Sequence, residues 1–179
     1  MQVKQIGIRM KTKIKIRLAA EDEREEMADI TRASYREYAD SREPEYWAKY
    51  ENETRKTILE DALLARLVAL IDNRIVGSAI ICAPYEWKIG KQIVKNPYPE
   101  MRLLAVLPEY RNFKIGAELI SACEEWTRDQ GFDYMTLHTT NLMQTAKAMY
   151  ERRGYERYFD IDFSPSPDFV VFGYKKSTR

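Results

Sequence analysis

The chain has 179 residues, a length that allows one globular domain with a hydrophobic core and leaves little room for a second. Apolar residues make up 45% and charged residues 32%, and the formal net charge of +1 argues against a nucleic-acid-binding module that works through bulk positive charge. The longest apolar stretch is interrupted by Arg66 and Asp72, so it is too short to span a membrane.

The N-terminal segment is strongly basic. Residues 1–17, MQVKQIGIRMKTKIKIR, contain six cations and no acid, and they lack the apolar centre and the small-residue cleavage site of a signal peptide. We expect residues 1–12 to form a solvated basic arm leading into an edge strand; contact with an acidic partner is the alternative. Residues 13–179 are then expected to form a single domain.

The two cysteines, Cys82 and Cys123, both lie in apolar periodic segments. This pattern favours buried, reduced thiols, and therefore a reducing compartment. We expect a cytoplasmic protein.

The first half of the chain predicts two helices and a hairpin. Residues 14–20 alternate like a strand, and helices are expected at 21–38 and 44–60, the second beginning at a proline. Two runs rich in Val, Ile and Leu flank Asp72 and Asn73, which tolerate the left-handed conformations of a tight turn. Residues 84–99 contain three prolines and a glycine and are predicted to form a loop.

The second half alternates strands and helices. Strands are predicted at 100–107, 133–140, through the alternating Phe159, Ile161 and Phe163, and at 168–175, with a turn at 165–167 before the last strand. Helices are predicted at 115–129 and 142–153, each followed by a glycine. The expected order is β-α-α-β-β-β-α-β-α-β-β, an α/β domain with a mixed sheet.

The junction between the strand at 100–107 and the helix at 115–129 is typical of a phosphate site. The first amides of a helix have no internal partner and lie at the positive end of its dipole. Arg111 and Lys114 add charge beside them, and Gly116 allows a ligand to approach the main chain. A Walker loop and a dinucleotide fingerprint are both excluded by the residues present. A purely structural turn is the alternative.

Three segments together resemble the GNAT superfamily of N-acetyltransferases. RNFKIGA (111–117) resembles its R/Q-x-x-G-x-G/A loop, which holds the pyrophosphate of acetyl-coenzyme A, and LLAVLPEYR (103–111) resembles its splayed fourth strand. AKAMYERRGYERY (146–158) is similar to its later helix and the strand that follows. The resemblance implies a mostly antiparallel, twisted sheet flanked by about four helices, with acetyl-coenzyme A as co-substrate. The loop residues that it implies for coenzyme binding are Arg111, Asn112, Phe113, Lys114, Ile115, Gly116 and Ala117.

The chain departs from the family pattern at two positions. Lys114 replaces the first loop glycine; we expect its side chain to be tolerated, with its ammonium near a phosphate, if its φ is negative, and coenzyme binding to be weakened otherwise. Met143 stands where the family often has asparagine, and Asn141 is expected to supply a similar amide contact.

The resemblance also implies roles on the central strand. Glu100 is a candidate general base, and a solvent-facing carboxylate is the alternative; a pKa raised by partial burial would favour the base. The amide of Val106 is expected to point at the thioester oxygen. Main-chain groups of Leu104 and Ala105 are expected to bind the pantetheine arm like an added strand.

Tyr150, near the end of the helix at 142–153, is the candidate acid that protonates the departing thiolate. A packed aromatic residue whose hydroxyl reaches solvent is the alternative. His138 is the only histidine, lies in a strand without a nucleophile elbow, and is interpreted as structural or substrate-lining. Because no His/Cys cluster has metal-ligand spacing, we predict no metal.

Aromatic residues concentrate in the segments expected to surround the acceptor. Together with acids such as Asp160, they would suit a cationic amine through cation–π contacts and charge. The aromatic residues in question are Tyr35, Tyr38, Tyr46, Trp47, Tyr85 and Trp87.

The sequence therefore predicts an acetyl-coenzyme-A-dependent N-acetyltransferase that acts on a primary amine, expected to be a small molecule, by direct transfer in a ternary complex. The alternative is a catalytically silent module of the same fold that senses acetyl-coenzyme A or a related ligand. Neither nucleic acid nor membrane is expected as a partner, and a homodimer fits the resemblance.

Overall fold

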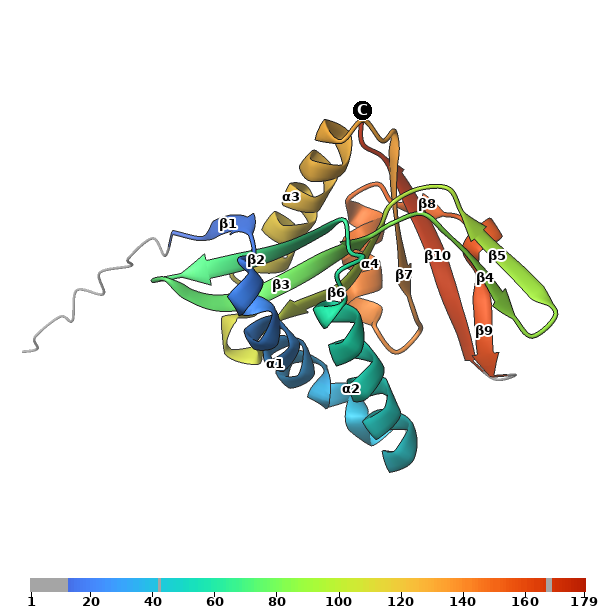
Figure 1. The fold of residues 1–179 in the computed structure, drawn as a ribbon, viewed down its shortest axis with the longest axis horizontal. Helices are drawn as coiled ribbons and strands as arrows, with labels where there is room; N and C mark the ends of the chain where they lie inside the picture. Colours follow the sequence, from blue (N-terminus) through green and yellow to red (C-terminus); the bar gives the residue numbers. More distant parts are fainter. Residues whose placement is uncertain (1–12, 42, 167–168) are drawn as a thin grey trace, which may run out of the picture.

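The computed structural model describes residues 13–41, 43–166 and 169–179, so the predicted basic arm at 1–12 lies outside the described residues. Its main sheet has the strand order β1-β2-β3-β6-β7-β10-β8, with β9 paired to β10 (Figure 1). The strands of this sheet are β1 (Lys15–Leu18), β2 (Ala65–Ile71), β3 (Arg74–Cys82), β6 (Glu100–Val106), β7 (Tyr134–Thr139), β8 (Glu156–Arg157), β9 (Phe163–Ser166) and β10 (Phe169–Ser177). Neighbouring strands are antiparallel except β6 and β7, as the predicted mixed sheet requires.

Within the described residues, four α-helices cover the two faces of the sheet, which confirms the predicted fold class. α1 (Arg24–Tyr35) and α2 (Pro44–Leu59) pack on one face, and α3 (Ile115–Asp129) and α4 (Gln144–Arg152) pack on the other (Figure 1). The short 3₁₀ segments η1 (Glu21–Glu23) and η2 (Arg36–Ser41) flank α1.

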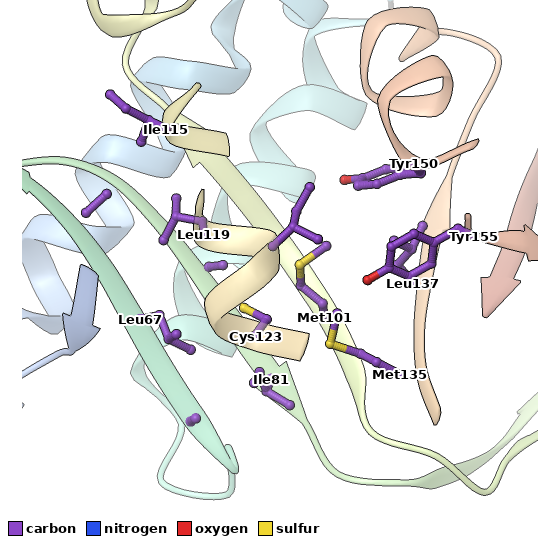
Figure 2. Close-up of a cluster of buried hydrophobic side chains, with 14 of the residues drawn as sticks. Leu67, Ile81, Met101, Ile115, Leu119, Cys123, Met135, Leu137, Tyr150 and Tyr155 are labelled. Atoms are coloured by element: carbon purple, nitrogen blue, oxygen red, sulfur yellow. The ribbon is translucent and has the colours of Figure 1, made fainter. Parts of the chain in front are cut away.

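The hydrophobic core has two layers because alternate side chains of a strand point to opposite faces. On β2, Leu67 and Ala69 pack in the cluster that contains α3, whereas Val68 and Leu70 pack in the cluster that contains α1. Figure 2 shows the first layer running from Leu67 past the α3 side chains to Tyr150 and Tyr155.

The turn between β2 and β3 forms as predicted. Asp72 and Asn73 both have positive φ angles, 50° and 62°, which join two antiparallel strands with a tight turn.

Two predicted segments were wrong. Residues 84–99 form a hairpin, β4 (Tyr85–Ile89) and β5 (Gln92–Asn96), rather than a loop, because the prolines lie outside its paired residues. The expected strand through Phe159 and Ile161 is a 3₁₀ turn, η4 (Phe159–Ile161), in which Phe159 is 71% exposed while Ile161 is fully buried. Only Phe163 belongs to a strand, β9; the predicted turn at 165–167 falls partly on that strand and partly outside the described residues.

The pairing of β6 with its neighbours breaks near its middle. Arg102 pairs with Ile80 and Ala105 with Ser78, so β6 carries one extra residue, and Leu103 has a φ of 52°. Such a bulge bends the strand that contains it. β6 and β7 pair only at Glu100–Thr136 and Met101–Leu137, and beyond these pairs they diverge (Figure 1).

Gly77 allows the bulged strand to lie against β3. A Cβ atom at this position would lie 2.8 Å from the carbonyl oxygen of Ala105 and 3.3 Å from side chains of Ile115 and Leu119. The absence of a side chain at Gly77 therefore fixes how closely β6 and α3 approach β3.

Gly77→Ala should lower the free energy of unfolding by about 1–3 kcal/mol, because overpacking against main-chain atoms forces β6 or α3 to move. Urea denaturation of the variant measures the loss. Gly116→Ala is the matched control, since its added Cβ meets nothing closer than 3.9 Å and its stability should be unchanged or slightly higher. Equal effects of the two substitutions would contradict this view of Gly77.

Candidate active site

A pocket of about 320 Å³ lies where β6 and β7 diverge. Its wall combines side chains from α1, η2, α2, β6, β7, α4, β9 and β10. Both predicted catalytic residues, Glu100 and Tyr150, line it. The fold thus brings together two residues that are 50 positions apart in the sequence.

Beyond the bulge, the main-chain N–H and C=O groups of successive β6 residues point alternately toward β3 and toward the region where β6 and β7 diverge. The carbonyl oxygen of Leu104 accepts a hydrogen bond from the Tyr35 hydroxyl (3.1 Å), and that of Val106 accepts one from Arg111 Nε (3.5 Å). The amide of Leu107 donates to the carbonyl oxygen of Val76 on β3 (3.0 Å), so the alternate residues Leu104 and Val106 direct their main-chain groups toward the divergence. The carbonyl of Ala105 points the other way, toward Gly77 on β3.

Arg111 connects the loop before α3 to the end of α1. Its guanidinium donates hydrogen bonds to the Glu37 carboxylate (2.7 Å) and to the carbonyl oxygen of Ser34 (2.8 Å). The hydrogen bond to Glu37 raises the pKa of Arg111, so the group stays charged. A phosphate bound by Arg111, as predicted, would have to compete with Glu37 and Ser34 for the same guanidinium.

Lys114 caps the N-terminus of α3 in the left-handed conformation, with φ 66° and ψ 9°. The condition of a negative φ is therefore not met, and a left-handed lysine costs roughly 1–2 kcal/mol. The strain lowers the free energy of unfolding, and the weaker coenzyme binding expected for this conformation stays a prediction. The Lys114 side chain is exposed beside the first turn of α3.

The first turn of α3 is buried on the side of Ile115 and partly exposed on the side of Gly116 and Ala117. Ile115 is buried in the core, while Gly116 has no side chain and Ala117 is half-buried. Before them, Asn112 also has a positive φ (67°), which asparagine tolerates, and Phe113 is 52% exposed. The amides at the start of such a helix have no intrahelical acceptor, as an anion site requires.

Glu100 is buried, so its interpretation as a solvent-facing carboxylate was wrong. Oε2 accepts hydrogen bonds from the Tyr85 hydroxyl (2.6 Å) and Asn96 Nδ2 (3.4 Å). Oε1 lies 3.2 Å from both Arg102 Nε and His138 Nδ1, yet no described donor is aligned to hydrogen-bond it.

The electrostatic surroundings of Glu100 keep it ionised. Burial raises the pKa of its carboxyl, but the His138 imidazole, the Arg102 guanidinium and the Tyr85 hydroxyl together lower that pKa below its ordinary value. A raised pKa, which would have favoured the role of general base, is therefore not found at Glu100. Glu100 is a carboxylate at neutral pH, and a weaker proton acceptor than a base with a raised pKa.

His138 is held by one ring nitrogen and by the packing of its ring. Nε2 lies 2.8 Å from the carbonyl oxygen of Ile161, which can only accept, so Nε2 carries a proton. Nδ1 faces Glu100, and the ring packs edge-to-face against Phe163 at 5.2 Å. His138 thus lines the pocket as a fixed part of its wall, which agrees with the predicted role.

Tyr150 is 6% exposed and packs edge-to-face against Tyr155, with ring centroids 5.8 Å apart (Figure 2). Burial raises the pKa of its phenol, so the hydroxyl keeps its proton at neutral pH. The alternative of an aromatic residue whose hydroxyl reaches open solvent does not match this burial. Asn141 is exposed, and its main-chain carbonyl oxygen accepts a hydrogen bond from the Gln144 side chain. Met143 caps the N-terminus of α4 and lines the pocket.

The predicted aromatic wall is partly confirmed. Four of the six residues line the pocket: Tyr35, Tyr38, Tyr46 and Trp47. Tyr85 and Trp87 stack on each other instead, with centroids 3.8 Å apart, behind Glu100 and Arg102. Asp160 is exposed and does not line the pocket.

Other residues that line the pocket were not predicted from the sequence, including Arg102, Tyr50, Phe163 and Phe169. The position of Arg102 two residues after Glu100 on one strand was the available signal, because i and i+2 share a face of a strand.

Comparison with known proteins agrees with this geometry. The model of the acetyltransferase (GNAT) family matches residues 24–155, which is more than half of the chain. The chain belongs to the GNAT acetyltransferase family. This assignment confirms the resemblance drawn from the loop at 111–117 and the helix at 146–158.

Individual GNAT relatives are distant. The probable N-acetyltransferase camello of Xenopus tropicalis is 29% identical over 92 residues, which cover 50% of this chain and 37% of that protein. The PaiA N-acetyltransferase of Thermoplasma acidophilum, in complex with coenzyme A, has a TM-score of 0.69 at 19% identity and covers 92% of this chain and 99% of its own. A GNAT acetyltransferase of Brucella melitensis in complex with acetyl-coenzyme A has a TM-score of 0.59 at 20% identity, covering 89% and 87%. At these identities the structures show a shared GNAT fold.

The two cysteines of this GNAT protein are free thiols. Burial raises the pKa of Cys82 to about 11 and also raises that of the buried Cys123, so neither free thiol is activated as a nucleophile. Within the part of the chain that the structure describes, no helix has the length and apolarity needed to cross a membrane. The expectation that the protein needs no metal stays a prediction.

Proposed function

We propose that this GNAT protein is an acetyl-coenzyme-A-dependent N-acetyltransferase that transfers the acetyl group directly to a primary amine of a small molecule in a ternary complex. One observation carries the proposal: the pocket containing Tyr150 lies where β6 and β7 diverge, Leu104 lines it, and the first turn of α3 lies beside Val106 at the end of the same strand. This arrangement offers an acid, a strand edge and an anion site along one strand.

The coenzyme would be held mainly by main-chain groups. The amides of Ile115, Gly116 and Ala117 suit the pyrophosphate, with the Lys114 ammonium adding charge. Leu104 and Val106 suit the pantetheine arm as an added strand, and the Val106 amide suits the thioester oxygen. Ala105, whose carbonyl faces β3, contributes to the sheet instead.

The chemistry needs one proton acceptor and one proton donor. The amine nitrogen forms a bond to the acetyl carbon while the carbon–sulfur bond breaks. We assign the departing amine proton to Glu100, the carboxylate among the described pocket residues, and the proton for the thiolate to Tyr150. Direct transfer is favoured because both thiols of the chain have raised pKa values.

Tyr150→Phe should lower kcat about 100-fold or more while leaving the affinity for acetyl-coenzyme A unchanged, because only the donated proton is lost. A thiol-release assay and a titration of the coenzyme measure the two quantities. Tyr155→Phe is the control, since Tyr155 packs beside Tyr150 but does not line the pocket. Retained turnover in Tyr150→Phe would exclude this residue as the acid.

Glu100→Gln should change the pH dependence of kcat/KM. Because its lowered pKa keeps Glu100 ionised, the parent profile should be level between about pH 6 and 8 for an ammonium acceptor. Without the carboxylate only the free amine reacts, so kcat/KM should rise about tenfold per pH unit. Melting temperatures in the same buffers control for unfolding, and a level profile in the variant would contradict the base assignment.

A catalytically silent sensor remains the competing function. It would bind acetyl-coenzyme A, as a rise in melting temperature reports, but would release no thiol with any amine. A sensor would have the same left-handed Lys114 and the same buried Glu100, so these two features do not distinguish it from an enzyme.

We also propose a cytoplasmic location, supported by the two free, buried or half-buried thiols. The homodimer, and the absence of nucleic-acid and membrane partners, stay predictions.

A further inference from the structure

One wall of the pocket is built from stacked aromatic rings. Tyr35 and Tyr50 stack with centroids 6.3 Å apart at 21°, and Trp47 lies 5.5 Å from Tyr50 at 32°. The hydroxyl of Tyr35 is fixed on the carbonyl of Leu104, so this wall is tied to β6. Phe163 and Phe169 line the pocket from β9 and β10.

The formal charges in the pocket cancel. Among the described residues that line it, Glu100 and Arg102 carry opposite charges, with Glu100 Oε1 3.2 Å from Arg102 Nε. His138 Nδ1 lies 3.2 Å from the same oxygen atom without an aligned hydrogen bond, and its Nε2 donates to the carbonyl oxygen of Ile161. Burial raises the pKa values of Tyr35, Tyr50 and Tyr150, so these phenols stay neutral.

This balance restricts the acceptor. One ammonium group finds aromatic faces and the unbonded Oε1 of Glu100, but a second finds no further carboxylate among the described lining residues. A buried cation without a partner is strongly unfavourable, whereas an apolar body gains from leaving water.

We infer that the acceptor is a monoamine carried on an aromatic or aliphatic body, and that polyamines are poor acceptors. This inference rests on the proposed function and specifies its substrate class. The volume of about 320 Å³ lies at the lower end of the range for ligand pockets, which fits one ring with a short amine-bearing chain.

The test compares acceptors that differ by one charge. Hexylamine and 1,6-diaminohexane have the same carbon chain, and 2-phenylethylamine adds a ring; thiol release at saturating acetyl-coenzyme A gives kcat/KM for each. We expect hexylamine and 2-phenylethylamine each to exceed the diamine by at least about tenfold. A diamine that reacts as well as either monoamine would overturn the inference while leaving the proposed function in place. No thiol release with any amine would overturn both.

Two variants locate the effect. Trp47→Ala should raise KM for 2-phenylethylamine about tenfold without changing KM for acetyl-coenzyme A, and Trp47→Phe should restore most of the loss. Tyr46→Glu places a carboxylate at a position that is 42% exposed on the pocket wall, so it should raise kcat/KM for the diamine relative to hexylamine. If Tyr46→Glu leaves that ratio unchanged in a folded protein, the charge argument is wrong.

Discussion

The early end of pairing between β6 and β7 is the constraint on which the rest of the site depends. After two residue pairs, the bulge at Leu103 bends β6 away from its parallel neighbour. The carbonyl oxygens of Leu104 and Val106 then accept from Tyr35 and Arg111, and the amides of these two residues become available to a ligand, because a strand edge demands partners. The pocket lies at this divergence, with both predicted catalytic residues in its wall.

The paired end of the two strands is held by buried polar groups. Asn96 donates to Thr136 Oγ1 (2.7 Å), which donates in turn to the carbonyl oxygen of Pro99 (3.0 Å), directly beside Glu100. Glu100 pairs with Thr136 across the strands and also faces Arg102. The same carboxylate therefore helps to fix the sheet and to set the charge of the pocket, and β5, which supplies Asn96, takes part in the site although it lies outside the main sheet.

The sequence predicts elements well where local chemistry decides them. The turn at Asp72 and Asn73 and the start of α3 at Ile115 follow from conformational preference and apolar spacing. The hairpin at 85–96 was missed because its prolines suggested a loop, although they lie outside the pairs. The burial of Glu100 was also missed, since its partners Tyr85 and His138 are brought to it by tertiary structure. No local pattern reveals the left-handed φ of Lys114.

Amide hydrogen exchange on β6 tests the central claim most directly. The account predicts that acetyl-coenzyme A slows exchange at Leu104 and Val106, and at the first amides of α3, while Ala105, which faces β3, changes little. ATP at the same concentration should leave Leu104 and Val106 unaffected. Unchanged exchange at these two amides with saturating acetyl-coenzyme A would contradict the claim that the divergence of β6 and β7 is the coenzyme site.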